Sequence, residues 1–160
     1  MRDESVGSGA PVETGQYVDF LRFRLAGAPH ALELGRVTQV VRRPVISRVP
    51  RVPETIAGAA TVGGDLTAAV DPCAVLGLTR RPADADRALV VLDRSVAPHS
   101  TGLLVGAVDG IERHAVESVA PAREADADER PVLATIELED GDRVPVVDAR
   151  GLLDAVEVRP

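Results

Sequence analysis

Few residues of this 160-residue chain combine the type and the spacing that catalysis or metal binding requires. The three histidines, His30, His99 and His114, lie far apart, and no His-x-x-x-His or Glu-x-x-His spacing occurs. The single cysteine, Cys73, follows an Asp-Pro pair without an activating base nearby, which is typical of a packed small side chain. We therefore predict no metal site, and we expect the histidines to lie on strands or on the surface.

Motifs for hydrolysis and nucleotide binding do not occur either. Gly63-Gly64 lacks the following Lys-Ser/Thr of a phosphate-binding loop, and there is no Gly-x-Ser-x-Gly elbow. Many carboxylates occur in short charged runs, which predict solvated loops. These residues are Asp84, Asp86, Glu124, Asp126, Asp128 and Glu129. An enzyme is therefore the weaker hypothesis, no cofactor is expected, and a protein-binding module is favoured.

Composition narrows the class of partner. The net charge is −7, and all 18 basic residues are arginine, a balance that disfavours nucleic acid and anionic membranes. Aromatic residues make up 2%, too few for base-stacking platforms. The longest apolar run, 88–92, is too short to span a bilayer, and from the first residues we expect no secretory signal. We expect a cytoplasmic protein without direct membrane insertion.

The elements that must position any site are short strands. In Leu21–Leu25 the apolar residues alternate with Arg22 and Arg24, which predicts a strand with both arginines toward solvent. Residues 88–92 predict a buried strand, and Asp109-Gly110 predicts a hairpin between 102–108 and 111–116. Turn signals recur every 8 to 12 residues or so, which indicates a small barrel or sandwich of about ten strands.

An internal repeat divides the chain. Gly64-Asp65, Val70-Asp71 and Leu76 recur 77 residues later as Gly141-Asp142, Val147-Asp148 and Leu153. In each copy a turn leads into a strand, and the strand ends at an aspartate that can cap a short helix. The repeat predicts two similar units.

The order of these motifs resembles the CheW-like family of chemotaxis adaptors. The opening strands match at Phe23-Arg24-Leu25, His30-Ala31-Leu32 and 37–41, and the Val49-Pro50…Pro53, Ile56-Ala57-Gly58 and Val70-Asp71…Leu76-Gly77 segments follow in order. The second half matches at 88–92, at 102–105 and at Val146-Val147-Asp148…Leu152-Leu153.

The resemblance implies a mainly β fold of two interlocked five-stranded SH3-like β-barrels with short helices. On this basis we expect a disordered tail (1–16), a CheW-like domain (17–155) whose halves change over near 80–87, and a C-terminal tail (156–160).

The resemblance also implies a non-enzymatic function. Such proteins couple the cytoplasmic signalling domain of a chemoreceptor to the regulatory domain of a CheA-type histidine kinase, at membrane-associated receptor arrays. The first barrel binds the kinase domain, and the receptor tip binds in a groove near the junction of the barrels.

The chain departs from the family at four polar positions, three of which are usually charged. Thr61 and Gly63 stand where the family has Asn and Arg, and Gln39 and Gly106 replace acidic residues. Loss of an arginine removes a charge and up to five donors. A divergent CheW-like module in another signalling assembly, with lost or altered receptor binding, is therefore an alternative; a small β-barrel enzyme is a remote one.

The resemblance locates a candidate partner surface, at positions that match where the family binds receptors or tunes that contact. Glycines there would let another backbone approach closely, valines would supply apolar contact, and Gln39 and Thr61 would supply uncharged hydrogen bonds. The same glycines could instead only shape turns. The candidate protein-binding residues are Val37, Gln39, Val40, Gly58, Thr61, Val62 and Gly63.

Overall fold

Short strands dominate the computed structural model, which describes residues 15–79, 87–122 and 131–157. In chain order the elements are β1 (Tyr17–Leu25), β2 (Ala28–Glu33), the 3-10 turn η2 (Leu34–Arg36), β3 (Val37–Arg42), β4 (Ile56–Val62), β5 (Asp65–Val70), α1 (Pro72–Leu76), β6 (Ala88–Leu92), β7 (Thr101–Val105), β8 (Val108–Ala115), the 3-10 turn η3 (Val116–Ser118), β9 (Val119–Pro121), β10 (Val132–Glu137), β11 (Arg143–Val147) and α3 (Ala149–Glu157). The predicted mainly β fold with short helices is confirmed.

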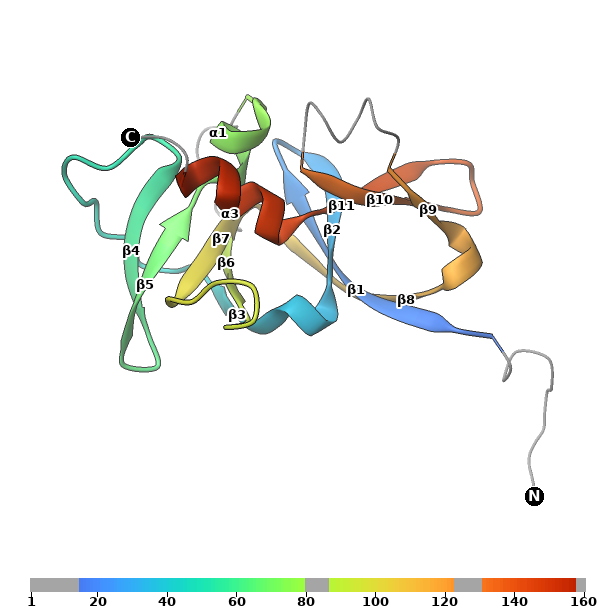
Figure 1. Cartoon of the computed structure of the whole chain (residues 1–160), viewed down its shortest axis with the longest axis horizontal. Helices are drawn as coiled ribbons and strands as arrows, with labels where there is room; N and C mark the ends of the chain where they lie inside the picture. The colour runs from blue at the N-terminus through green and yellow to red at the C-terminus, as the bar shows by residue number, and fades with distance from the viewer. Residues whose placement is uncertain (1–14, 80–86, 123–130, 158–160) are drawn as a thin grey trace, which may run out of the picture.

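The described strands form two sheets, which lie side by side in Figure 1. Subdomain A is the six-stranded sheet β8-β1-β2-β11-β10-β9, and subdomain B is the five-stranded sheet β3-β6-β7-β5-β4. Helix α3, red in Figure 1, begins at the end of β11 in subdomain A and packs against α1. The sixth strand of subdomain A is the three-residue β9, which the five-strand expectation did not include.

The two sheets have the same pairing pattern and exchange their first hairpins. Each contains an antiparallel edge pair (β8–β1 or β3–β6), an antiparallel hairpin (β1–β2 or β6–β7), a parallel pair (β2–β11 or β7–β5) and a second hairpin (β11–β10 or β5–β4). The first hairpin of each sheet comes from the opposite half of the sequence. The predicted interlocking is therefore a reciprocal exchange of β1–β2 and β6–β7.

The chain passes between the sheets at η2 and at Gly106-Ala107. The predicted change-over near 80–87 falls between α1 and β6, and residues 80–86 lie outside the described residues. The strands on either side of that segment, β5 and β6, belong to the same sheet. The segment therefore separates the two sequence halves, whereas the sheets are linked elsewhere.

The internal repeat is present as two matching hairpins. In β4–β5 the register shifts between Ile56 and Gly58, and in β10–β11 it shifts at the equivalent place, between Val132 and Ala134. The aspartate after each hairpin donates its amide hydrogen to the carbonyl of the residue before it, over 2.7 Å: Asp71 to Thr55 and Asp148 to Pro131. These matches confirm the repeat predicted from the sequence.

Each repeat ends in a capped helix, as predicted. Asp71 accepts a hydrogen bond from the Cys73 amide at 3.0 Å, and Pro72 and Gly77 (φ 71°) begin and end α1. Asp148 accepts from the Gly151 amide at 3.0 Å at the start of α3. Helix α3 continues to Glu157, into the segment 156–160 expected as a tail. Of the N-terminal tail expected over 1–16, only residues 15 and 16 lie within the described residues.

The buried apolar residues form three cores, one between the two sheets and one on the outer face of each sheet. The largest lies between the sheets and joins Leu21, Phe23 and Leu25 of β1 to Val90 and Leu92 of β6 and to Leu152 of α3. A second core, around Phe20 and Ile136, covers the other face of subdomain A. A third, around Val62 and Leu89, covers the other face of subdomain B. Both faces of β6 are therefore covered, which explains why all five of its residues are buried.

The hairpin predicted at Asp109-Gly110 is wrong. The chain leaves subdomain B after Val105. Asp109-Gly110 lie inside the next strand, β8, which pairs with β1. Gly110, with φ 133°, lies opposite Arg22, where the ladder contains a register shift. Long-range pairing with β1 thus overrides the local turn signal. The glycine instead allows the backbone conformation of the register shift in the β1–β8 pairing.

The predicted orientation of β1 is correct in its apolar residues and partly wrong in its arginines. Leu21, Phe23 and Leu25 are buried, and Arg24 is exposed beside Asp109. Arg22, in contrast, is only 12% exposed and forms an ion pair with Glu112 at 2.8 Å. Because the second core covers this face of subdomain A, Arg22 shares it with Phe20 and needs a charged partner.

Candidate protein-interaction surfaces

The residues singled out for chemistry remain apart in the structure. Cys73 is buried in the core between the sheets, and burial raises the pKa of its thiol, so the prediction of a packed side chain is confirmed. His30 lies buried on β2, His114 on β8 and His99 in an exposed loop. Within 15–79, 87–122 and 131–157 no three His, Cys, Asp or Glu side chains gather closely enough to hold a metal ion.

The carboxylates expected in solvated loops, Asp84, Asp86, Glu124, Asp126, Asp128 and Glu129, all lie outside the described residues. No described helix is long and apolar enough to cross a bilayer.

The candidate partner residues on β3 differ in what they offer. Gln39 is exposed on this edge strand of subdomain B, and its side chain is free to meet a partner. Val37 and Val40 are half-buried and pack against the core between the sheets. These two valines contribute more to packing than to an outer surface.

The candidate residues on β4 and its turn also separate into two kinds. Thr61 and Gly63 are exposed, and Gly63 (φ 57°) forms the β4–β5 turn with open space around it. Val62 is buried in the third core, with 8% of its surface exposed. Together with Thr61 it borders a hollow whose other walls include Val41 of β3 and the exposed Leu66 of β5.

Gly58 has an internal role. It is buried at the β4 bulge with φ 151°, and a Cβ placed there would lie 2.3 Å from the Ser47 carbonyl oxygen. Ser47 and Ala59 exchange two backbone hydrogen bonds of 2.8 Å. The close approach that this glycine was expected to offer a partner is therefore made by the chain's own residues 46–47.

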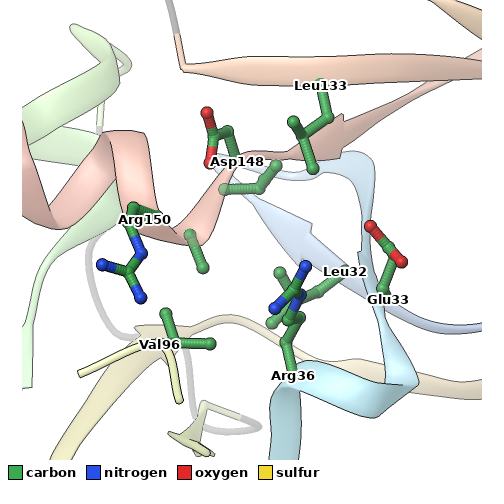
Figure 2. Close-up of a pocket in the computed structure, with 9 residues that line it drawn as sticks. Leu32, Glu33, Arg36, Val96, Leu133, Asp148 and Arg150 are labelled. Atoms are coloured by element: carbon green, nitrogen blue, oxygen red, sulfur yellow. The ribbon is translucent and has the colours of Figure 1, made fainter. Parts of the chain in front are cut away.

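A pocket opens where the two subdomains meet. Its walls come from β2 and η2 on one side, from the loop after β6, and from β10, β11 and the start of α3. Figure 2 shows Arg150 and Val96 on one side of the opening, and Glu33 and Leu133 on the other. The full lining is Leu32, Glu33, Arg36, Val96, Leu133, Val147, Asp148, Ala149 and Arg150.

Hydrogen bonds hold the walls of this junction pocket in place. The Asp93 amide donates to the Arg36 carbonyl at 2.8 Å, and the Arg150 guanidinium donates to the Ser95 carbonyl. The Asp93 carboxylate in turn accepts the Ser95 amide at 2.9 Å. Hydrogen bonds from Ser95, with a smaller contribution from Arg36, lower the pKa of Asp93. Backbone and charge thus tie η2, the loop after β6 and α3 together.

The size and composition of the junction pocket suit a protein side chain better than a free ligand. Its volume is about 110 Å³, below the range of roughly 300–1,000 Å³ that is usual for small-molecule sites. Its rim carries Glu33, Arg36, Asp148 and Arg150 around the apolar Leu32, Val96 and Leu133. An apolar floor within a charged rim is the usual anatomy of a protein-binding surface.

Sequence reasoning missed three sets of exposed residues. Leu133 at the junction pocket is 43% exposed, and Val45 and Leu66 of subdomain B are 83% and 75% exposed. Four arginines also fall within 42–51, in a stretch from 34 to 53 that contains no acidic residue. That charge pattern was visible in the sequence of a chain with net charge −7, whereas the exposure of single apolar residues was not.

A family model and a solved structure match this chain, and both point to the same family. A family model described as the CheW-like domain matches residues 19–157. No curated protein matches the chain by sequence. Among solved structures, the scaffolding protein TtCheW from Thermoanaerobacter tengcongensis matches with a TM-score of 0.77 and 21% identity, over 86% of this chain and 92% of that one.

The likeness to TtCheW concerns the fold. It confirms the predicted architecture of two SH3-like β-subdomains, because nearly all of that chain is covered at a high TM-score. The family match spans both subdomains and the described helices α1 and α3, from within β1 to the last residue of α3. By the extent of that match, the chain belongs to the CheW-like domain family.

Proposed function

We propose that this chain is a non-enzymatic adaptor that couples the cytoplasmic signalling domain of a chemoreceptor to the regulatory domain of a CheA-type histidine kinase. The observation that carries the proposal is the CheW-like match over residues 19–157, which leaves almost no described residue outside it. In such a cytoplasmic adaptor, placement at receptor arrays follows from the receptor contact.

The junction pocket is the proposed contact for the receptor's helical tip. Its apolar residues can accept a side chain from one face of a helix, and its rim charges of both signs can orient that helix. Leu133 is the most informative member, because its side chain is partly exposed and its loss opens no core.

The exposed candidates on subdomain B, Gln39, Thr61 and Gly63, are proposed as further contacts for the receptor. They lie on or beside its edge strands β3 and β4, outside the junction pocket. Val37, Val40, Val62 and Gly58 support this surface from beneath by packing.

Calorimetric titration of the full chain tests the proposal, with a receptor signalling fragment and the kinase regulatory domain added separately and together. A Leu133→Glu variant should weaken receptor binding by about tenfold or more, because it places a charge in the apolar pocket. Ile111→Glu, the same kind of change at an exposed apolar residue of β8 outside both candidate surfaces, is the matched control and should leave receptor binding within about twofold.

The outcomes separate the two adaptor hypotheses. Binding of both fragments, with the receptor sensitive to Leu133→Glu, supports the coupling function. The neutral Gln39 and Gly63 favour the alternative of a divergent module with other partners, since an acidic residue and an arginine usual in the family are replaced there. Failure of the unaltered chain to bind either fragment would reject coupling and leave that alternative. Gly58→Asp is unsuitable as a probe, because its side chain would collide with Ser47.

A further inference from the structure

Subdomain B has a second, larger groove that the proposed function does not use. Residues 43–55 connect β3 to β4 without a helix or strand, apart from the bridge between Ser47 and Ala59. This segment, with Arg87 and Leu104, encloses an open groove of about 850 Å³. The groove shares no residue with the junction pocket.

The groove is positively charged in an otherwise acidic protein. Among the described residues, Arg48, Arg51 and Arg87 line it, with Glu54 as the one carboxylate. The Arg43 amide donates to the Arg87 carbonyl at 3.1 Å, which brings the Arg43 backbone next to the groove, although Arg43 itself lines the hollow beside Thr61 and Val62. Arg42 precedes Arg43 at the end of β3. All five arginine side chains are exposed, and none forms an ion pair or side-chain hydrogen bond with a described residue.

Clustered unpaired arginines repel one another, and an anionic partner relieves that repulsion. Elsewhere in the described residues, Arg22, Arg24, Arg113 and Arg143 each have a carboxylate beside them. The groove thus concentrates cationic side chains that are free to form bidentate contacts with carboxylates.

Apolar side chains lie between these charges. Val49 and Val52 line the groove and are 42% and 38% exposed, and prolines 50 and 53 stiffen the segment that carries them. Arg51 has a φ of 65°, an unfavourable conformation for a residue with a side chain, so the surrounding segment holds it in place. Fixed apolar contacts between cations suit a peptide that carries both acidic and apolar residues.

We propose that this arginine groove binds an acidic segment of a partner protein, with carboxylates on the arginines and apolar side chains on Val49 and Val52. A membrane or a nucleic acid is a poorer fit, because the net charge of −7 would repel an extended polyanion beyond the groove. The proposal needs neither the receptor nor the kinase to be the partner, so it stands or falls apart from the proposed function.

Fluorescence anisotropy provides the test, with a labelled peptide of about ten residues in which glutamates alternate with leucines. The same peptide with glutamine for glutamate is the neutral control. The full chain should bind the glutamate peptide at least about tenfold more tightly. Raising the salt from about 0.1 M to about 1 M, which shortens the screening length from about 10 Å to about 3 Å, should remove most of that difference.

Reversing the charge of groove arginines tests whether the peptide binds in the groove. Arg48→Glu combined with Arg87→Glu changes both walls and should lower affinity for the glutamate peptide by at least about tenfold. Arg143→Glu, an exposed arginine of subdomain A, is the matched control and should leave affinity within about twofold. Circular dichroism of each variant reports folding, and Arg48→Gln with Arg87→Gln, which adds no charge, should give an intermediate loss.

Three results would overturn the proposal. Equal binding of both peptides would show that charge is not recognised, and an unchanged affinity in the charge-reversed variant would place binding elsewhere. Tighter binding of phosphatidylserine vesicles or single-stranded DNA than of the peptide, lost in the same variant, would assign the groove to a different class of partner.

Discussion

The β4–β5 and β10–β11 hairpins have the same backbone arrangement, but the sequences that precede them carry opposite net charge. Both contain a register shift near the start, and both lead into a helix capped by an aspartate. In sequence, the segment between β3 and β4 carries three arginines and one carboxylate, whereas the segment before β10 carries four carboxylates and two arginines. Packing constrains the hairpins themselves, so the two halves differ in charge mainly in the segments that precede them.

The shared core provides the largest expected effect. Phe23→Ala should lower the free energy of unfolding by about 3–5 kcal/mol, because the ring is fully buried between the two sheets. Both subdomains should still unfold in a single transition in a denaturant titration followed by circular dichroism. Two separated transitions would show that the halves are independent, contrary to the exchange of hairpins.

Gly58 and Ala134 occupy equivalent places in the two hairpins, opposite Ala69 and Val146. Gly58→Ala should cost about 1–3 kcal/mol of stability, because its Cβ would overlap the Ser47 carbonyl. Ala134→Gly should cost only about 0.5–1 kcal/mol, the entropy of a more flexible unfolded chain. Thermal unfolding measures both changes, and equal losses would mean that residues 46–47 do not constrain β4 as described.

The helix caps provide the smallest effect and the closest test of equivalence. Asp71→Ala and Asp148→Ala should each lose about 0.5–2 kcal/mol, and the double variant should lose their sum, because they cap different helices. Asn at either position should retain most of the stability, since it also caps. A loss at one aspartate only would limit the functional equivalence of the two repeats to their backbones.

Local patterns predicted the elements of this fold well. The alternation in β1, the apolar run of β6 and the capped helix after β5 are consequences of residue type and short spacing. The β8 hairpin was wrong because Asp109-Gly110 meets β1, almost ninety residues away, and a local signal contains no information about that strand. Arg22 was misplaced for the same reason, since its partner Glu112 comes from β8.

The candidate site was less predictable than the fold. Gln39, Thr61 and Gly63 are exposed, but Val62 and Gly58 are buried by chain segments that the motif alone does not reveal. The junction pocket collects residues from β2, η2, β10 and α3, which only the exchanged topology brings together. The arginine groove could have been anticipated from charge along the sequence, although its shape depends on how residues 43–55 cross β4.

The exchanged first hairpin has a consequence for the order of folding during synthesis. The strands of subdomain B all lie between residues 37 and 105, so its sheet can assemble while the ribosome is still extending the chain. The β1–β2 hairpin emerges first but must wait for β8 and for β11, which reaches it through the parallel pair of Ala31 and Val146. Such distant pairing slows folding and leaves strand edges open meanwhile. We therefore expect nascent chains that stop before β11 to be prone to aggregation and to bind chaperones. The chaperones should dissociate only once the last strand completes the sheet.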